Sequence, residues 1–230
     1  MLNAFIKHVS KATGLSLKSA ETALGIVLNT ADRQGAPLAD EVFERVPGAR
    51  TLAETFASFD AHSASQVDTA LQGAWAAQKT WRATTMQERC MLLRRVAAVL
   101  RERKSQLARL ITLEMGKPIL EAEGEVEKCA WNCEFYAEKA PELLGDELVP
   151  SGATESRVVY DALGVVLAIM PWNYPLWQVV RFAAPALAAG NGIVLKHANN
   201  VPQCALELER VFRDAGTPAG LFATLLVEAP

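Results

Sequence analysis

The chain has 230 residues, of which 50% are hydrophobic and 21% are charged, and its formal net charge is −3. This composition supports a buried core and excludes an intrinsically disordered protein. The basic residues form no run, so nothing favours binding to nucleic acid or to an anionic membrane surface. No apolar stretch reaches the roughly 20 residues that span a bilayer, and the first residues lack the pattern of a signal peptide. We therefore expect a cytoplasmic protein with neither a nucleic-acid nor a membrane partner.

The first part of the chain, residues 1–50, predicts a small helical module. Its first apolar positions recur with helical spacing: Leu2, Phe5, Ile6 and Val9. Gly14 is placed to end this helix, and Ser16 to cap the start of a second one. Nothing in these residues indicates a chemical role.

Residues 51–147 predict a larger helical region. Ser63 with Gln66, and Thr85 with Glu88, have the spacing of capping boxes. The apolar run that follows Thr85 predicts one long helix as far as Gly116, and a third helix is expected to end near Pro141. We interpret these helices as scaffold.

The four cysteines allow two interpretations. Cys129 and Cys133 lie four residues apart on a predicted helix, so both sulfurs would share one face. That spacing could serve a metal ion, but no second pair and no nearby histidine completes a site. Buried thiols in a reducing cytosol are favoured for these two and for Cys90 and Cys204, and we predict no metal site.

Beyond residue 148 the pattern changes from helices to strands. Segment 156–161 alternates like an exposed strand, and the apolar run VVLAIM after Gly164 predicts a strand that is buried on both faces. Strands and helices then alternate with the period of βαβ units. They are expected at 165–170, 175–190, 193–196, 202–215 and 222–227. The fold class is therefore α/β, with β-α-β-α-β forming half of a doubly wound, Rossmann-like parallel sheet.

Two segments lie where such sheets bind ligands, outside the carboxyl ends of the strands. The first runs from Met170 to Asn173. It contains no G-x-G-x-x-G fingerprint, but the amide of Asn173 carries two N–H donors that could stabilise a developing oxyanion. The alternative is that Asn173 caps the following helix.

The second segment runs from Lys196 to Asn199 and contains no acidic residue. In the ordinary dinucleotide fold an acid near this place binds ribose hydroxyls, whereas a cation tolerates a 2′-phosphate. The alternative is that Lys196 is a solvated lysine at the end of a strand.

These segments belong to a longer resemblance. The stretches LGVVLAIMPWNYPLWQVVRFAAPALAAGN (163–191) and VLKHANNVPQCALELERVFRDAG (194–216) resemble the cofactor-domain core of aldehyde dehydrogenases. They are most similar to the bacterial NAD(P)-dependent succinate-semialdehyde dehydrogenases. The stretch LITLEMGKPILEAEGEVEKCAWNCEFYAE (110–138) resembles the same family. The likeness covers about residues 51–228.

The resemblance implies a role for individual residues. Those that would line the dinucleotide crevice are Ile169, Met170, Pro171 and Trp172. Asn173 would be the oxyanion donor for the thiohemiacetal and thioester intermediates, and Lys196 would hold the adenosine ribose hydroxyls. Asn199 stands where NAD-preferring members often have a glutamate, so we expect NADP to be accepted, alongside NAD.

The resemblance also assigns the segments of the chain. Residues 51–147 would be the helical part of the N-terminal domain, 148–162 oligomerisation strands of a homo-oligomer, and 163–230 a partial NAD(P)-binding domain. The substrate would be a small-molecule aldehyde, such as succinic semialdehyde.

Three parts of the family's machinery lie beyond the third strand in relatives: the cysteine nucleophile, the glutamate base and a Gly-Ser-x-x-x-Gly turn. None of the four cysteines here matches the nucleophile. We therefore expect a truncated relative that is inactive alone, with its third strand as an open edge that favours self-association. The alternative is a non-catalytic fragment that binds a nucleotide or a protein. In relatives, this region usually begins with a short strand that carries an Asn-Pro-x-x-Gly-Glu sequence. Here segment 51–54 follows directly on the helical module instead, which indicates a fusion or a recombined gene.

Overall fold

The computed structural model describes residues 1–33, 37–49 and 59–227. It opens with a helical module made of α1 (Leu2–Thr13), α2 (Leu17–Arg33) and α3 (Pro37–Arg45). Gly14 ends α1 in the left-handed conformation, with φ 70°, and the hydroxyl of Ser16 accepts a hydrogen bond from the Ser19 N–H at 3.1 Å. Both predicted helix boundaries are confirmed. The expected boundary at residue 50 and segment 51–54 lie outside the described residues.

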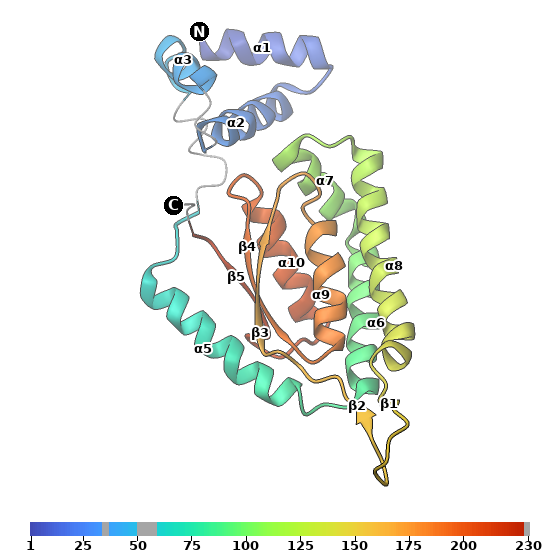
Figure 1. The fold of residues 1–230 in the computed structure, drawn as a ribbon. Coiled ribbons are helices and arrows are strands. Elements are labelled where there is room, and N and C mark those ends of the chain that lie inside the picture. Colours follow the sequence, from blue (N-terminus) through green and yellow to red (C-terminus); the bar gives the residue numbers. More distant parts are fainter. Residues whose placement is uncertain (34–36, 50–58, 228–230) are drawn as a thin grey trace.

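The N-terminal module has a small hydrophobic core of its own. Its buried residues are Ile6, Ala20, Leu24, Leu28 and Ala49. The module lies beside the larger body in Figure 1, and α2 contacts α7.

The next helices are α5 (Ala64–Trp81), α6 (Met86–Glu102), α7 (Lys104–Met115) and α8 (Ile119–Leu143). The last three, α6, α7 and α8, contact one another and form the helical layer of the body. Both predicted capping boxes are present, at Ser63 and at Thr85. The single long helix that we expected from residue 85 to Gly116 is wrong, because the chain breaks at Arg103. The guanidinium of Arg103 bonds the Asp214 carboxylate at 2.7 Å. No helix in the described part of the chain is long and apolar enough to cross a membrane.

The last helix of this layer runs past the expected stop. α8 continues to Leu143 with Pro141 inside it. Proline is tolerated there because it lies in the last turn, where it removes one backbone hydrogen bond and leaves the rest of the helix intact.

An exposed two-stranded hairpin connects the helical layer to the sheet. Strands β1 (Glu147–Leu148) and β2 (Arg157–Val158) pair antiparallel, and all four residues are exposed. The predicted strand at 156–161 is therefore present but shorter.

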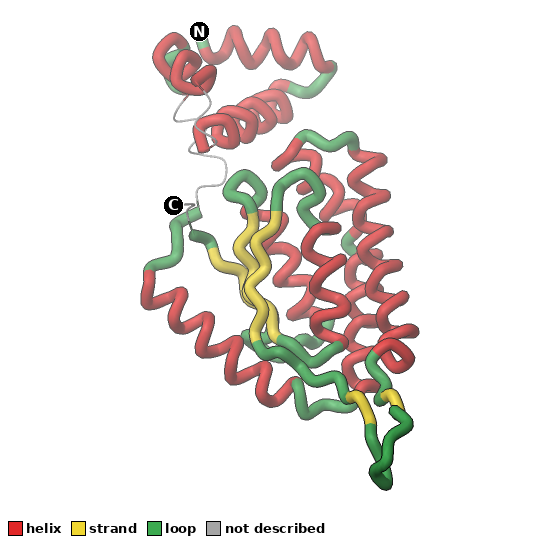
Figure 2. The backbone as a smooth tube through the Cα atoms, in the orientation of Figure 1, coloured by secondary structure: helices red, strands yellow, loops and turns green. Residues whose placement is uncertain are grey.

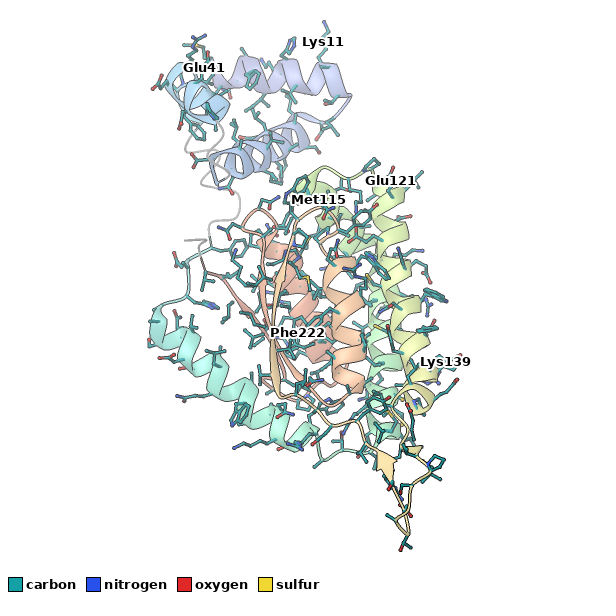
Figure 3. All side chains as sticks on the ribbon, viewed as in Figure 1. Lys11, Glu41, Met115, Glu121, Lys139 and Phe222 are labelled. Atoms are coloured by element: carbon teal, nitrogen blue, oxygen red, sulfur yellow. The ribbon has the colours of Figure 1, made fainter. Side chains whose placement is uncertain are left out.

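The remaining elements alternate: β3 (Val165–Met170), α9 (Trp177–Ala188), β4 (Gly192–His197), α10 (Pro202–Asp214) and β5 (Phe222–Leu225). The sheet order is β3-β4-β5 and both pairings are parallel. In the helical layer, α9 contacts α6 and α8, and α10 contacts α6 and α7. α5 contacts the sheet from its other side (Figures 1 and 2). The main core lies between the sheet and the helical layer, where the Phe212 ring stacks on that of Phe222 at 4.4 Å between ring centroids. Phe222 is labelled in Figure 3. The α/β class is confirmed.

One expectation about β3 is wrong. We predicted a strand buried on both faces, but Leu167 is 58% exposed and Ile169 is 70% exposed. β4 lies at the centre of the described sheet and is buried almost throughout, whereas β3 lies at an edge. An apolar run therefore identified the strand but not the number of its covered faces.

Four charged side chains from the helical layer hold the ends of α9 and α10. Glu125 accepts hydrogen bonds from the first backbone N–H groups of α9, and Glu114 does the same for α10. Arg89 donates to a carbonyl at the end of α9 and Arg95 to one at the end of α10. Anionic groups at N-termini and cationic groups at C-termini match the helix dipoles. These contacts fix where each helix begins after its strand.

Candidate active site

The parallel register brings the two predicted site segments together. Met170, the last residue of β3, pairs with His197, and Ile169 pairs with Lys196. The segments 170–173 and 196–199 therefore leave adjacent strands at the same edge of the sheet. This edge lies at the end of the body where α7 finishes at Met115, which is labelled in Figure 3.

The residues expected to line a crevice are apolar, and three of the four are exposed at this edge. Ile169 is 70% exposed and Trp172 is 47% exposed. Pro171 is exposed as well, while Met170 is half-buried and packs against the main core. Exposed indole and aliphatic side chains provide apolar surface on which a flat, partly apolar ligand can pack.

Asn173 lies in the loop between β3 and α9, and its side chain is exposed. The capping alternative is wrong, because α9 has Leu176 at its N-cap and no side-chain cap there. The N–H groups of Leu176 and Trp177 are instead accepted by the Glu125 carboxylate, at 2.9 and 3.0 Å. The amide donors of Asn173 are thus not used for capping the helix and face solvent.

Lys196 is held in place rather than freely solvated. Its ammonium donates to the Asn199 side-chain oxygen at 2.7 Å and to the His197 carbonyl at 3.0 Å. Burial lowers the pKa of Lys196 from its ordinary value. Because Asn199 presents its oxygen to the ammonium, its amide N–H₂ group points away, and the two side chains together offer donors at the end of β4.

His197 joins the two segments, and sequence reasoning missed it. Its Nδ1 accepts from the Ala198 N–H at 2.8 Å, so Nε2 carries the ring hydrogen and donates to the Pro175 carbonyl at 2.8 Å. Burial, with a further contribution from the charge of Lys196, lowers the pKa of His197. The neutral ring therefore connects the end of β4 to the loop that carries Asn173.

Lys117 and Glu125 were also missed. Both are buried, and their side chains form an ion pair beneath the loop after β3. A sequence signal existed for Glu125: it occupies the apolar stripe of α8 together with Ala122, Val126 and Cys129, where an acid is out of place.

The cysteines take no part in this site. All four are free and buried, so the prediction of buried thiols is confirmed. Burial raises the pKa of Cys133 to about 12 and raises those of Cys90, Cys129 and Cys204 as well. Within residues 1–33, 37–49 and 59–227, no group of histidine, cysteine and acidic side chains could hold a metal ion.

Three relatives are similar to this chain. A probable succinate-semialdehyde dehydrogenase [NADP(+)] of Synechocystis sp. is 50% identical over 174 residues, which are 76% of this chain and 38% of the relative. A succinate-semialdehyde dehydrogenase [NADP(+)] of Mycobacterium leprae is 47% identical over 179 residues, which are 76% of this chain and 39% of the relative. The crystal structure of a succinic semialdehyde dehydrogenase from Streptococcus pyogenes in complex with NADP+ matches with a TM-score of 0.72 at 34% identity. That match covers 75% of this chain and 38% of the solved one.

The chain thus spans somewhat under two fifths of the length of these relatives. Residues 43–229 match the model of the aldehyde dehydrogenase family. This match covers most of the chain and agrees with the motifs at the ends of β3 and β4. The chain therefore belongs to the aldehyde dehydrogenase family.

Proposed function

We propose that this chain supplies the oxyanion donor and the ribose-binding group of an NADP-linked aldehyde dehydrogenase. Its substrate is a short semialdehyde of the succinic semialdehyde type, which is oxidised to the acid. The observation that carries the proposal is the pairing of β3 with β4, which puts the Asn173 loop beside Lys196. The names of the relatives from Synechocystis and Mycobacterium leprae support both the substrate and the cofactor.

The residues at the strand ends fit an NADP cofactor. Lys196 has three N–H donors and uses two of them within the described part of the chain; the third suits a ribose hydroxyl. Asn199 is neutral, so it exerts no repulsion on a 2′-phosphate, and NAD remains a second cofactor. Ile169, Met170, Pro171 and Trp172 line the crevice in which the dinucleotide packs. The nicotinamide of the cofactor would supply the hydride acceptor at this site.

Asn173 acts on the substrate. Its amide donates a hydrogen bond to the aldehyde oxygen as negative charge develops on that atom. A donor fixed before the reaction contributes about 2.7–4 kcal/mol, or roughly 10²–10³ in kcat, at sites of this kind. The first amides of α9 are already bonded to Glu125, so the cofactor's phosphates bind elsewhere.

The remaining segments take supporting roles in the proposal. Residues 51–147 are the helical part of the family's N-terminal domain, and 163–230 are part of a doubly wound cofactor domain. Residues 148–162 pair with another subunit of a homo-oligomer. Leu148, Val158 and Val159 are exposed on this segment, and exposed apolar strands favour pairing.

A fusion tests the activity. The 230-residue chain is joined to the part of the Synechocystis relative that it does not match, and NADPH formation from succinic semialdehyde is followed by the absorbance of the reduced nicotinamide. We expect turnover in the fusion and a roughly 10²–10³-fold lower kcat after Asn173→Ala. A folded fusion that binds NADP+ yet forms no NADPH, or an Asn173→Ala variant with unchanged kcat, would refute the proposal.

A further inference from the structure

Two charged side chains are buried beneath the loop that carries Asn173. The side chain of Lys117 is 6% exposed and that of Glu125 is 1% exposed. Removing two charges from water costs free energy, and apolar residues of similar volume often serve a fold as well or better. Such a pair therefore calls for a reason besides stability.

The contacts of the pair provide one. One oxygen of Glu125 bonds Lys117, and the other accepts from the N–H groups of Leu176 and Trp177. The ammonium of Lys117 lies 3.6 Å from the centre of the Tyr174 ring, within the range of a cation–π contact. The pair thus holds a side chain and two backbone groups within four residues of Asn173.

The loop is held from its other side as well. His197 donates to the Pro175 carbonyl at 2.8 Å, and Met170 is fixed by its pairing in the sheet. Only residues 171–173 lie between the strand and these contacts, and all three are exposed. The backbone on both sides of Asn173 is therefore fixed, although the side chain itself is free to meet a ligand.

We infer that Lys117 and Glu125 are positioning residues, which hold the loop from Pro171 to Tyr174 in its ligand-binding position. The inference rests on the proposed function for the identity of the ligand, NADP. The role of the pair goes beyond stabilising the fold, because the pair acts through Tyr174 and the start of α9 on residues that contact the ligand. If the loop reaches its binding position in only a tenth of the molecules, the apparent Kd rises about tenfold.

The decisive variant removes both charges together. Lys117→Met with Glu125→Gln leaves no unpaired buried charge, so its unfolding midpoint should stay near that of the unchanged chain. The loop nevertheless loses the cation over Tyr174 and the charged acceptor at α9. We expect NADP+ binding to the 230-residue chain, measured by calorimetry, to weaken about tenfold.

A spectroscopic signal reports on the loop without any ligand. The chain is labelled with 3-fluorotyrosine, and its three tyrosines are Tyr136, Tyr160 and Tyr174. Tyr174→Phe assigns the third ¹⁹F resonance. We expect the double variant to shift the Tyr174 resonance and to leave that of Tyr160 in place.

Arg89→Met is the matched control, because Arg89 bonds the opposite end of the same helix, at Ala188. It should lower the unfolding midpoint while the Tyr174 resonance and the affinity for NADP+ stay unchanged. Tyr174→Leu, an exposed position, provides a variant that does not disturb the core. It should weaken NADP+ binding less than the double variant does, because the contacts of Glu125 with α9 remain. Because the two changes share the contact between Lys117 and Tyr174, their combined effect should be smaller than the sum of their separate effects.

The outcomes separate the two claims. A folded double variant with an unmoved Tyr174 resonance and unchanged affinity overturns the inference, as does additivity with Tyr174→Leu. If the unchanged chain does not bind NADP+, the proposed function fails, and the ¹⁹F spectra still decide whether Lys117 and Glu125 hold the loop.

Discussion

Replacing Glu125 by glutamine, with Lys117 left in place, makes the strongest prediction about stability. The variant leaves the buried ammonium of Lys117 without its counter-ion. Removing one partner of a buried ion pair costs about 3–5 kcal/mol, against a total free energy of unfolding of roughly 5–15 kcal/mol for a typical domain. In a chain of this size that loss corresponds to a fall in Tm of about 6–20 °C.

An exposed pair gives the comparison. Arg101 and Glu134 also form an ion pair, but their side chains are 38% and 40% exposed, and exposed pairs contribute about 0–1 kcal/mol. Urea unfolding followed by circular dichroism measures both variants. We expect Glu125→Gln to cost several times as much as Glu134→Gln. Equal losses would refute the reasoning, because burial would then make no difference to the pair.

Three further predictions follow from the burial of particular groups. Because burial lowers the pKa of His197, the folded protein binds fewer protons than the unfolded chain in mild acid. Its stability is complete above about pH 6.5 and falls as the pH drops below that value. His197→Gln should lose this part of the pH dependence in urea titrations, and identical slopes in both proteins would contradict it. The thiols of the native chain should not react with Ellman's reagent at mildly alkaline pH, since burial raises the pKa of Cys133 to about 12. All four thiols should react in urea. Rapid reaction without urea would contradict the burial of the cysteines. Leu167→Lys should reduce concentration-dependent self-association measured by light scattering, because Leu167 is 58% exposed on β3 and exposed apolar surface favours association. Unchanged association would contradict a contact through this face of β3.

The elements of the sheet could be predicted closely from local patterns. The apolar run after Gly164 gave β3 its observed bounds, Val165–Met170, and Gly216 follows the last residues of α10 as expected. The exposed face of β3 could not be predicted, since the cover of a face depends on which layers pack against it. The break in the helix at Arg103 could not be predicted either, because it depends on a contact with a distant part of the chain. Helix-forming residues continue through it, and its partner Asp214 lies 111 residues away in the sequence.

In the candidate site, too, residues identified by local sequence could be predicted, and residues identified by contacts across the fold could not. Asn173 and Lys196 could be predicted because they lie close to the carboxyl ends of β3 and β4, where open α/β sheets bind ligands. Lys117, Glu125 and His197 were missed because their contacts depend on the fold: Glu125 meets the Leu176 N–H across 51 residues. A buried acid within an apolar helical stripe was the visible signal. Interpreting the helices of residues 51–147 as scaffold leaves that signal unused.

Calorimetric titration of NADP+ into the 230-residue chain and its Lys196→Met variant tests the central claim most directly. We expect saturable binding with a Kd on the order of 100 μM, or about −5.5 kcal/mol, and binding at least tenfold weaker after Lys196→Met, a loss of about 1.4 kcal/mol. Lys139→Met, at an exposed lysine of α8 labelled in Figure 3, should leave the affinity unchanged. Binding that is absent at millimolar NADP+, or equally strong in all three proteins, would contradict a ribose-binding site at the end of β4.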